Sequence, residues 1–162
     1  MPKDCLMLLE QVIEAFDSEF APLSTRLVGG YDEPFYLAGP PSEIRFREDF
    51  LRSALHEVAH WCVAGAERRK QDDFGYWYCP DGRDQAQQQA FEQVEVRPQA
   101  IEAEFCQAIG IPFCPSQDNL NGDVLPDPAF GHAINALRQS WQMGQGKPPA
   151  RAIQFINRLR QI

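Results

Sequence analysis

This chain contains few histidines. Its sequence pattern also predicts neither a membrane-spanning nor a secretory segment. Only three of the 162 residues are histidines. No apolar run reaches the roughly 18 residues that a transmembrane helix needs, so no membrane partner is expected. The start of the chain leads from Lys3 and Asp4 into an amphipathic pattern containing Glu10 and Glu14. That pattern predicts that no signal peptide is present.

Cysteines spaced for a disulfide framework or a metal site are also lacking. The five cysteines are odd in number, dispersed and without any C-x-x-C pair: Cys5, Cys62, Cys79, Cys106 and Cys114. This arrangement argues against disulfides and against a cysteine zinc site, and it predicts a protein of the reducing cytoplasm.

Positive charge is in deficit. Lysine and arginine number 15 against 23 aspartates and glutamates, which gives a formal net charge of −8. This balance disfavours direct binding to the nucleic-acid backbone and suits a cationic partner.

The length and the order of the expected elements indicate a single α+β domain over residues 1–162. It should contain a short sheet of about three to four strands, packed with several helices. A first helix begun by Asp4 is expected over residues 4–20, with Leu6, Leu9, Ile13, Phe16 and Phe20 as its buried stripe. Strands are expected at residues 25–28, 34–37 and 43–47, the first ended by a Gly29-Gly30 turn, with Ile44 and Phe46 facing inward. Further helices are expected at residues 49–64, 84–109, 128–143 and 149–161, with Asp84 capping the second and Pro98 kinking or splitting it.

Residues 56–60 spell H-E-x-x-H, the most informative pattern in the chain. On a helix, His56 and His60 lie on one face, so both imidazoles can reach one metal ion. Glu57 lies about a quarter-turn away, where it can touch a metal-bound water. Apolar flanks predict a buried helix that ends near Gly65 in a left-handed conformation. The alternative is a pair of hydrogen-bonded structural histidines.

A third ligand must come from outside this helix, because the motif does not continue as H-E-x-x-H-x-x-G-x-x-H. Val63 stands at the position of the glycine, and Ala66 stands at the position of the third histidine. The best candidate is Glu95, at the edge of an apolar stripe, since a carboxylate among aliphatic side chains is costly unless paired or metal-bound. That stripe is expected to comprise Phe91, Val94, Pro98, Ile101 and Phe105. Glu92 is expected to face solvent or to support a ligand, whereas Glu102 and His132 remain alternative ligands. Glu95 could instead pair with a basic residue such as Arg97.

Two histidines and one carboxylate support two chemistries. With zinc they make a hydrolase in which Glu57 acts as the base, so a small zinc-dependent peptidase is one interpretation. With iron(II) they make a triad with open positions for oxygen and substrate. A non-catalytic, metal-stabilised binding module is a third interpretation.

Residues 72–84 concentrate aromatic rings and carboxylates. Aromatic faces together with carboxylates can bind an alkylammonium group, which makes Tyr76 and Asp81 candidate substrate-binding residues. The alternative is that the rings belong to the core and the aspartates to turns and caps.

Four segments together resemble the bacterial elongation factor P hydroxylase family. They are HEVAHWC at residues 56–62, DFGYWYCPDGRD at 73–84, FEQVEVRPQA at 91–100 and DNL at 118–120. The resemblance runs from about residue 25 to 122, and the long aromatic motif makes it specific.

The resemblance implies a function. Such an enzyme hydroxylates the modified lysine of elongation factor P after a β-lysyl group has been attached to it. His56, His60 and Glu95 would then supply an iron-type site for Fe(II) or another divalent metal, with molecular oxygen as co-substrate. No 2-oxoglutarate requirement is implied, and the fold is likened to that of a small metal-dependent endoribonuclease family. In a hydroxylase, Glu57 would orient a ligand, relay a proton or bind substrate.

Overall fold

The computed structural model describes residues 3–72, 85–116 and 128–162. In this part of the chain, five α-helices accompany one three-stranded sheet, which confirms the predicted α+β class. The helices are α1 (Lys3–Glu19), α2 (Leu51–Val63), α3 (Gln85–Ala108), α4 (Pro128–Gln142) and α5 (Ala150–Leu159). The strands are β1 (Thr25–Tyr31), β2 (Phe35–Leu37) and β3 (Ser42–Arg47), and two short 3₁₀ helices are η1 (Ala21–Leu23) and η2 (Arg68–Lys70). None of the described helices is long and apolar enough to cross a membrane.

The sheet has the order β1-β3-β2, with β1 parallel and β2 antiparallel to β3. The expected end of the first strand at Gly29-Gly30 is wrong, because β1 continues through a register shift to Tyr31, which pairs with Arg47. Gly30 makes this irregularity feasible with a φ of 93°, a conformation that glycine adopts without steric cost.

The first helix and the sheet bury apolar faces against one core. Ile44 and Phe46 are buried, as their alternation predicted. The expected stripe of the first helix is wrong at Leu6, which is 39% exposed, since burial begins at Leu9. Asp4 lies inside the first turn of α1 rather than before it, because the helix already begins at Lys3.

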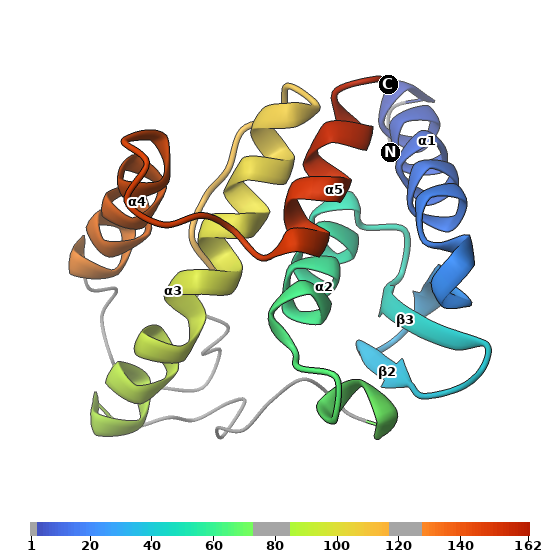
Figure 1. The fold of residues 1–162 in the computed structure, drawn as a ribbon, viewed down its shortest axis with the longest axis horizontal. Coiled ribbons are helices and arrows are strands. Elements are labelled where there is room, and N and C mark those ends of the chain that lie inside the picture. Colours follow the sequence, from blue (N-terminus) through green and yellow to red (C-terminus); the bar gives the residue numbers. More distant parts are fainter. Residues whose placement is uncertain (1–2, 73–84, 117–127) are drawn as a thin grey trace.

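Helix α2 lies at the centre of the molecule. Figure 1 shows it between the sheet and α3, with α1 at one end of the molecule and α4 at the other. The residues of α2 that face the core are fully buried: Ala54, Leu55, Val58 and Ala59. They join side chains from α1, β1, β3, α3 and α5 in the main hydrophobic cluster. A helix so enclosed holds its remaining polar stripe in a fixed position.

The end of α2 differs from the expectation. Ala64 follows the helix in an extended conformation (φ −60°, ψ 133°), and positive φ values occur at other glycines but not at Gly65. The Arg69 guanidinium instead donates to the carbonyl oxygens of Trp61 and Ala64. A cationic side chain therefore satisfies the helix end, which makes a left-handed glycine unnecessary.

Helix α3 is not split at Pro98 and forms one element of 24 residues. A smaller apolar cluster of Ala100, Phe130 and Ile134 joins it to α4. Packing on both sides of α3 compensates for the backbone hydrogen bond that proline removes.

Candidate metal centre

His56 and His60 lie one turn apart on α2 and converge. Their ring centroids are 4.7 Å apart, and the two Nε2 atoms lie 3.2 Å from each other. Their side chains are 12% and 15% exposed. The i, i+4 spacing and the buried helix together place both imidazoles at the same point, as the sequence indicated.

Glu95 on α3 reaches this point from the opposite side. Its Oε2 lies 2.9 Å from His60 Nε2, and its Oε1 lies 3.4 Å from His56 Nε2. One atom from each of the three residues falls within 4.8 Å of the others, so the group could hold a metal ion. The structure brings together the three residues selected from the sequence, and their role as ligands stays a prediction.

The Glu95 carboxylate fits a metal better than it fits a hydrogen-bond network. The side chain is 1% exposed, and its Oε2 lies 2.9 Å from His60 Nε2 without hydrogen-bond geometry to any residue that the structure describes. A buried anionic oxygen left in this state is costly, whereas coordination to a cation would satisfy it. Two imidazole nitrogens and one carboxylate oxygen form a donor set suited to iron(II) or zinc.

The charges in this group depend on one another. Burial opposes ionisation of Glu95, but the adjacent His60 and His56 hold its pKa well below the ordinary value of 4.5. Burial likewise opposes protonation of His56, but its contacts with Glu102 and Glu95 outweigh this and raise its pKa well above 6.5. Without a metal, the site therefore favours a proton on His56 opposite an ionised Glu95.

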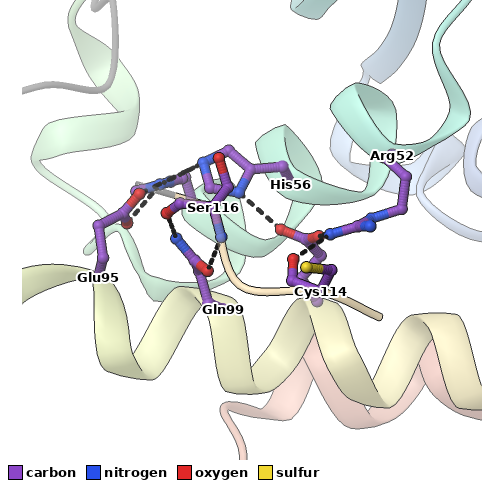
Figure 2. Close-up of polar contacts among 8 residues, drawn as sticks. Arg52, His56, Glu95, Gln99, Cys114 and Ser116 are labelled. Carbon is purple, nitrogen blue, oxygen red and sulfur yellow. Dashed lines mark hydrogen bonds and ion pairs between the residues drawn. The ribbon is translucent and has the colours of Figure 1, made fainter. Parts of the chain in front are cut away.

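The other nitrogen of His56 contacts a second carboxylate. His56 Nδ1 lies 2.7 Å from Glu102 Oε1, and Arg52 binds the other oxygen of Glu102, with Nη2 at 2.8 Å and Nε at 3.1 Å from Oε2. Figure 2 shows Arg52 and His56 in one row of polar contacts that leads toward Glu95. Glu102 joins Arg52 to His56 in this row. Glu102 thus lies on the far side of His56 from the point where the three candidate ligands meet.

The remaining alternatives for a third ligand lie elsewhere. His132 is exposed on α4 and does not belong to the group that could hold a metal. Glu92 is only 8% exposed, so of its two expected roles the solvent-facing one is wrong, and the role of supporting a ligand stays a prediction. Val94, expected in the buried stripe, is 51% exposed. The buried face of α3 is therefore partly polar, and the side chains that make it so are Glu92, Glu95, Gln99 and Glu102.

Sequence reasoning missed Arg52 and Gln99. Gln99 is fully buried and exchanges two hydrogen bonds with the backbone of Ser116, at 2.6 and 2.9 Å. Arg52 also donates to the carbonyl oxygen of Cys114, at 2.7 Å. Both side chains thus fasten the segment after α3 beside the site (Figure 2). The available signal was spacing, because Arg52 precedes His56 by the same four residues that separate His56 from His60.

A cavity of about 180 Å³ opens beside His60. Its walls are mostly apolar and come from β2, β3, α2 and α3, with the segment around η2 at one side. The charged and polar residues of the wall are Glu57, His60, Arg68 and Arg69, and the exposed Val94 also lines it. The largest side chains of the lining are Phe35, Tyr36 and Trp61. One member of the group that could hold a metal, His60, therefore borders the cavity.

Tyr76 and Asp81 lie outside the described residues, as does Asp84 with its proposed cap. Asp72, the last described residue before them, accepts a hydrogen bond of 2.8 Å from the backbone N–H of Ala38. This contact fixes the chain just after η2, which contributes to one side of the cavity.

The fold and the site define a class: an α+β protein in which two histidines of one helix and a glutamate of the next could hold a metal ion. Comparison with known proteins narrows this class. A profile of the elongation factor P hydroxylase family matches residues 15–162. The chain is also 49% identical over 131 residues to a Haemophilus influenzae protein named elongation factor P lysine hydroxylase, covering 78% of this chain and 74% of that protein. This chain belongs to the elongation factor P hydroxylase family.

Proposed function

We propose that the chain is an enzyme that hydroxylates the β-lysylated lysine of elongation factor P, and that residues 1–162 act as one catalytic domain. The observation that carries this proposal is the buried convergence of His56, His60 and Glu95 in a chain of the hydroxylase family. The relative named as a lysine hydroxylase supports the choice of residue type. All four cysteines in the described part of the chain are free, which supports a reducing, cytoplasmic location.

Iron(II) is the proposed metal, and molecular oxygen is the proposed co-substrate. Two imidazoles and one carboxylate leave open positions on iron(II) at which oxygen and substrate can be activated. The chain supplies a rigid holder for this ion, because α2 is enclosed by the core and Glu95 approaches it from α3. Rigid placement of the ligands limits the rearrangement that metal binding requires.

The cavity beside His60 is the proposed binding site for the substrate side chain. Its aromatic and aliphatic walls suit the methylene groups of a long lysine-derived arm. Glu57 is 9% exposed and lies in the same wall, next to His60. We assign it as the catalytic residue, whose carboxylate orients the arm and holds or moves a proton at the bound substrate.

The ammonium groups of the substrate require partners of opposite charge or aromatic character. Tyr76 and Asp81 are proposed for this role, because aromatic faces and carboxylates are concentrated in residues 72–84. The net charge of −8 provides a general attraction for a cationic arm.

The decisive experiment is hydroxylation by purified protein. Anaerobically prepared protein loaded with iron(II), then given oxygen gas and a two-electron reductant such as ascorbate, should add one oxygen atom to β-lysylated elongation factor P while the second oxygen atom leaves as water; mass spectrometry of the modified peptide detects the product. Isotopically labelled oxygen gas should supply the added atom. Unmodified elongation factor P should react far more slowly if the β-lysyl group is recognised.

Zinc-loaded protein provides the matched control. It should show neither hydroxylation nor cleavage of peptide substrates. Peptide cleavage by the zinc form without hydroxylation by the iron form would replace the proposal with a zinc-dependent peptidase.

A further inference from the structure

We infer that Glu102 is a positioning residue for His56, that Arg52 holds Glu102 in this role, and that neither of them coordinates the metal. The inference rests on the proposed metal site and deepens it. It concerns the row of side chains Arg52–Glu102–His56, which continues the line of the candidate ligands along α2 and α3.

The two oxygens of Glu102 have separate partners. Oε1 faces His56 Nδ1 at 2.7 Å, whereas Oε2 faces the Arg52 guanidinium at 2.8 and 3.1 Å. A carboxylate with both oxygens engaged in this way has no free oxygen directed at the metal position. Glu102 is also 2% exposed, so Arg52 and His56 are the partners that make its burial tolerable.

The contact determines which nitrogen of His56 can bind metal. An ionised carboxylate only accepts hydrogen bonds, so Nδ1 must carry the proton and donate to Glu102. The lone pair then lies on Nε2, the atom that is 3.2 Å from His60 Nε2 and 3.4 Å from Glu95 Oε1. A hydrogen bond from the second ring nitrogen commonly orients a metal-binding histidine in this way.

Arg52 is itself held firmly. Besides Glu102, its guanidinium contacts the Cys114 carbonyl oxygen at 2.7 Å and lies 5.1 Å from the centroid of the Phe113 ring. Figure 2 shows Arg52 at the outer end of the row, with Cys114 beside it. The position of Glu102 is therefore fixed from outside the site before any metal arrives.

The same helix offers a matched control. Glu104, two residues after Glu102, forms an ion pair with Arg138 of α4 at 2.8 Å, and both partners are largely buried, with side chains 15% and 20% exposed. This pair has similar chemistry but contacts neither candidate histidine, and Glu104 is less buried than Glu102. Substituting it tests what a lost carboxylate on α3 costs in general.

The test measures metal affinity in Glu102→Leu, Glu102→Gln, Arg52→Gln and Glu104→Leu, using cobalt(II) as the probe ion. We expect Glu102→Leu to weaken binding by about 10- to 100-fold, the usual effect of removing such a support. Glu102→Gln should weaken it less, because the amide oxygen can still accept from Nδ1. Arg52→Gln should fall between wild type and Glu102→Leu, and Glu104→Leu should bind as wild type does.

The visible spectrum of bound cobalt(II) separates support from coordination. Saturated Glu102→Leu should show the wild-type bands, because no ligand has been removed. A changed band pattern would mean that Glu102 is a ligand and would overturn the inference. Equal affinities for Glu102→Leu and wild type, or equal losses for Glu102→Leu and Glu104→Leu, would overturn it as well.

A measurement on the unaltered protein covers the case in which Glu102→Leu fails to fold. In zinc-loaded wild type, nitrogen NMR should show the His56 proton on Nδ1 and the metal on Nε2, and the reverse assignment would overturn the inference. Neither readout depends on hydroxylation, so failure of the proposed function would be seen separately.

Discussion

Glu95 Oε2 lies 2.9 Å from His60 Nε2, a contact that joins a carboxylate of α3 to the H-E-x-x-H helix across 35 positions of the sequence. The order of contacts between the two helices is reversed: His60 meets Glu95, whereas Arg52 meets Glu102 farther along α3. Helices α2 and α3 therefore pack antiparallel, with polar side chains along the interface between them. In this interface the candidate ligands lie toward the cavity, whereas Arg52 and Glu102 lie away from it.

The two histidines should be needed for metal binding but not for folding. We expect His56→Ala and His60→Ala each to abolish metal retention and hydroxylation, because each removes one of three donors. Both residues are partly exposed, and the apolar face of α2 remains intact, so circular dichroism should show the fold retained. His56→Ala should lower the melting temperature, because it removes a partner from the buried carboxylates of Glu95 and Glu102. Full metal occupancy and full activity in either variant would rule out this helix as the metal site.

Glu95 and Glu92 should behave differently, although both are buried on α3. We expect Glu95→Gln to lose metal affinity by more than about 100-fold, beyond the usual effect of removing a supporting residue, because a neutral amide replaces an anionic ligand. Glu92→Gln should keep wild-type affinity, since Glu92 lies outside the group that could hold a metal. Metal content after dialysis measures both, and similar mild losses would contradict the assignment of Glu95.

Metal and proton should compete at this site. The pKa of His56 is raised above 6.5, so its contribution to the stability of the metal-free protein is complete below pH 6.5 and is lost as pH rises through the folded-state value. The pKa of Glu95 is lowered below 4.5, so its contribution is present above pH 4.5 and is lost as pH falls through its own folded-state value. The contributions of His56 and Glu95 taken together should therefore make the metal-free protein most stable between pH 4.5 and 6.5.

Calorimetry measures this competition. Metal binding near neutral pH should release about one proton, because His56 must lose a proton to coordinate. Titrations in two buffers of different ionisation enthalpy give the proton count, and His56→Ala, which should not bind the metal, gives the background heat. Binding without proton release, together with a flat pH profile for the melting temperature of chelated protein, would contradict the charge arrangement described for the site.

The sequence predicted the type and approximate bounds of the described helices and strands, because each depends on local periodicity and on turn residues. It could not predict the strand order or the parallel pairing of β1 with β3, since these depend on contacts between distant segments. The Gly29-Gly30 pair predicts a strand end, but the conformational freedom of Gly30 lets the strand continue through a bulge.

The polar face of α3 shows why the site was only partly predictable. Apolar periodicity correctly placed Phe91, Ile101 and Phe105 in the interior. It placed Val94 there as well, although that side chain is exposed and lines the cavity beside α2. Glu95 and Glu102 are seven residues apart and share one helical face, so spacing alone could not tell a ligand from a support. Only the register between α2 and α3 directs one carboxylate to Nε2 and the other to Nδ1.

Filling the cavity should block the substrate while leaving the metal in place. Val94 is 51% exposed and forms part of the cavity wall, so Val94→Trp places a large ring where the substrate arm is proposed to bind. Neighbouring Gln93 is also exposed but does not line the cavity, which makes Gln93→Trp the matched control. We expect Val94→Trp to lower kcat/KM for β-lysylated elongation factor P at least about tenfold, the loss that corresponds to roughly 1.4 kcal/mol of transition-state stabilisation. Gln93→Trp should match wild type, and both variants should bind metal normally. Normal turnover by folded Val94→Trp would show that the arm reaches the metal by another route.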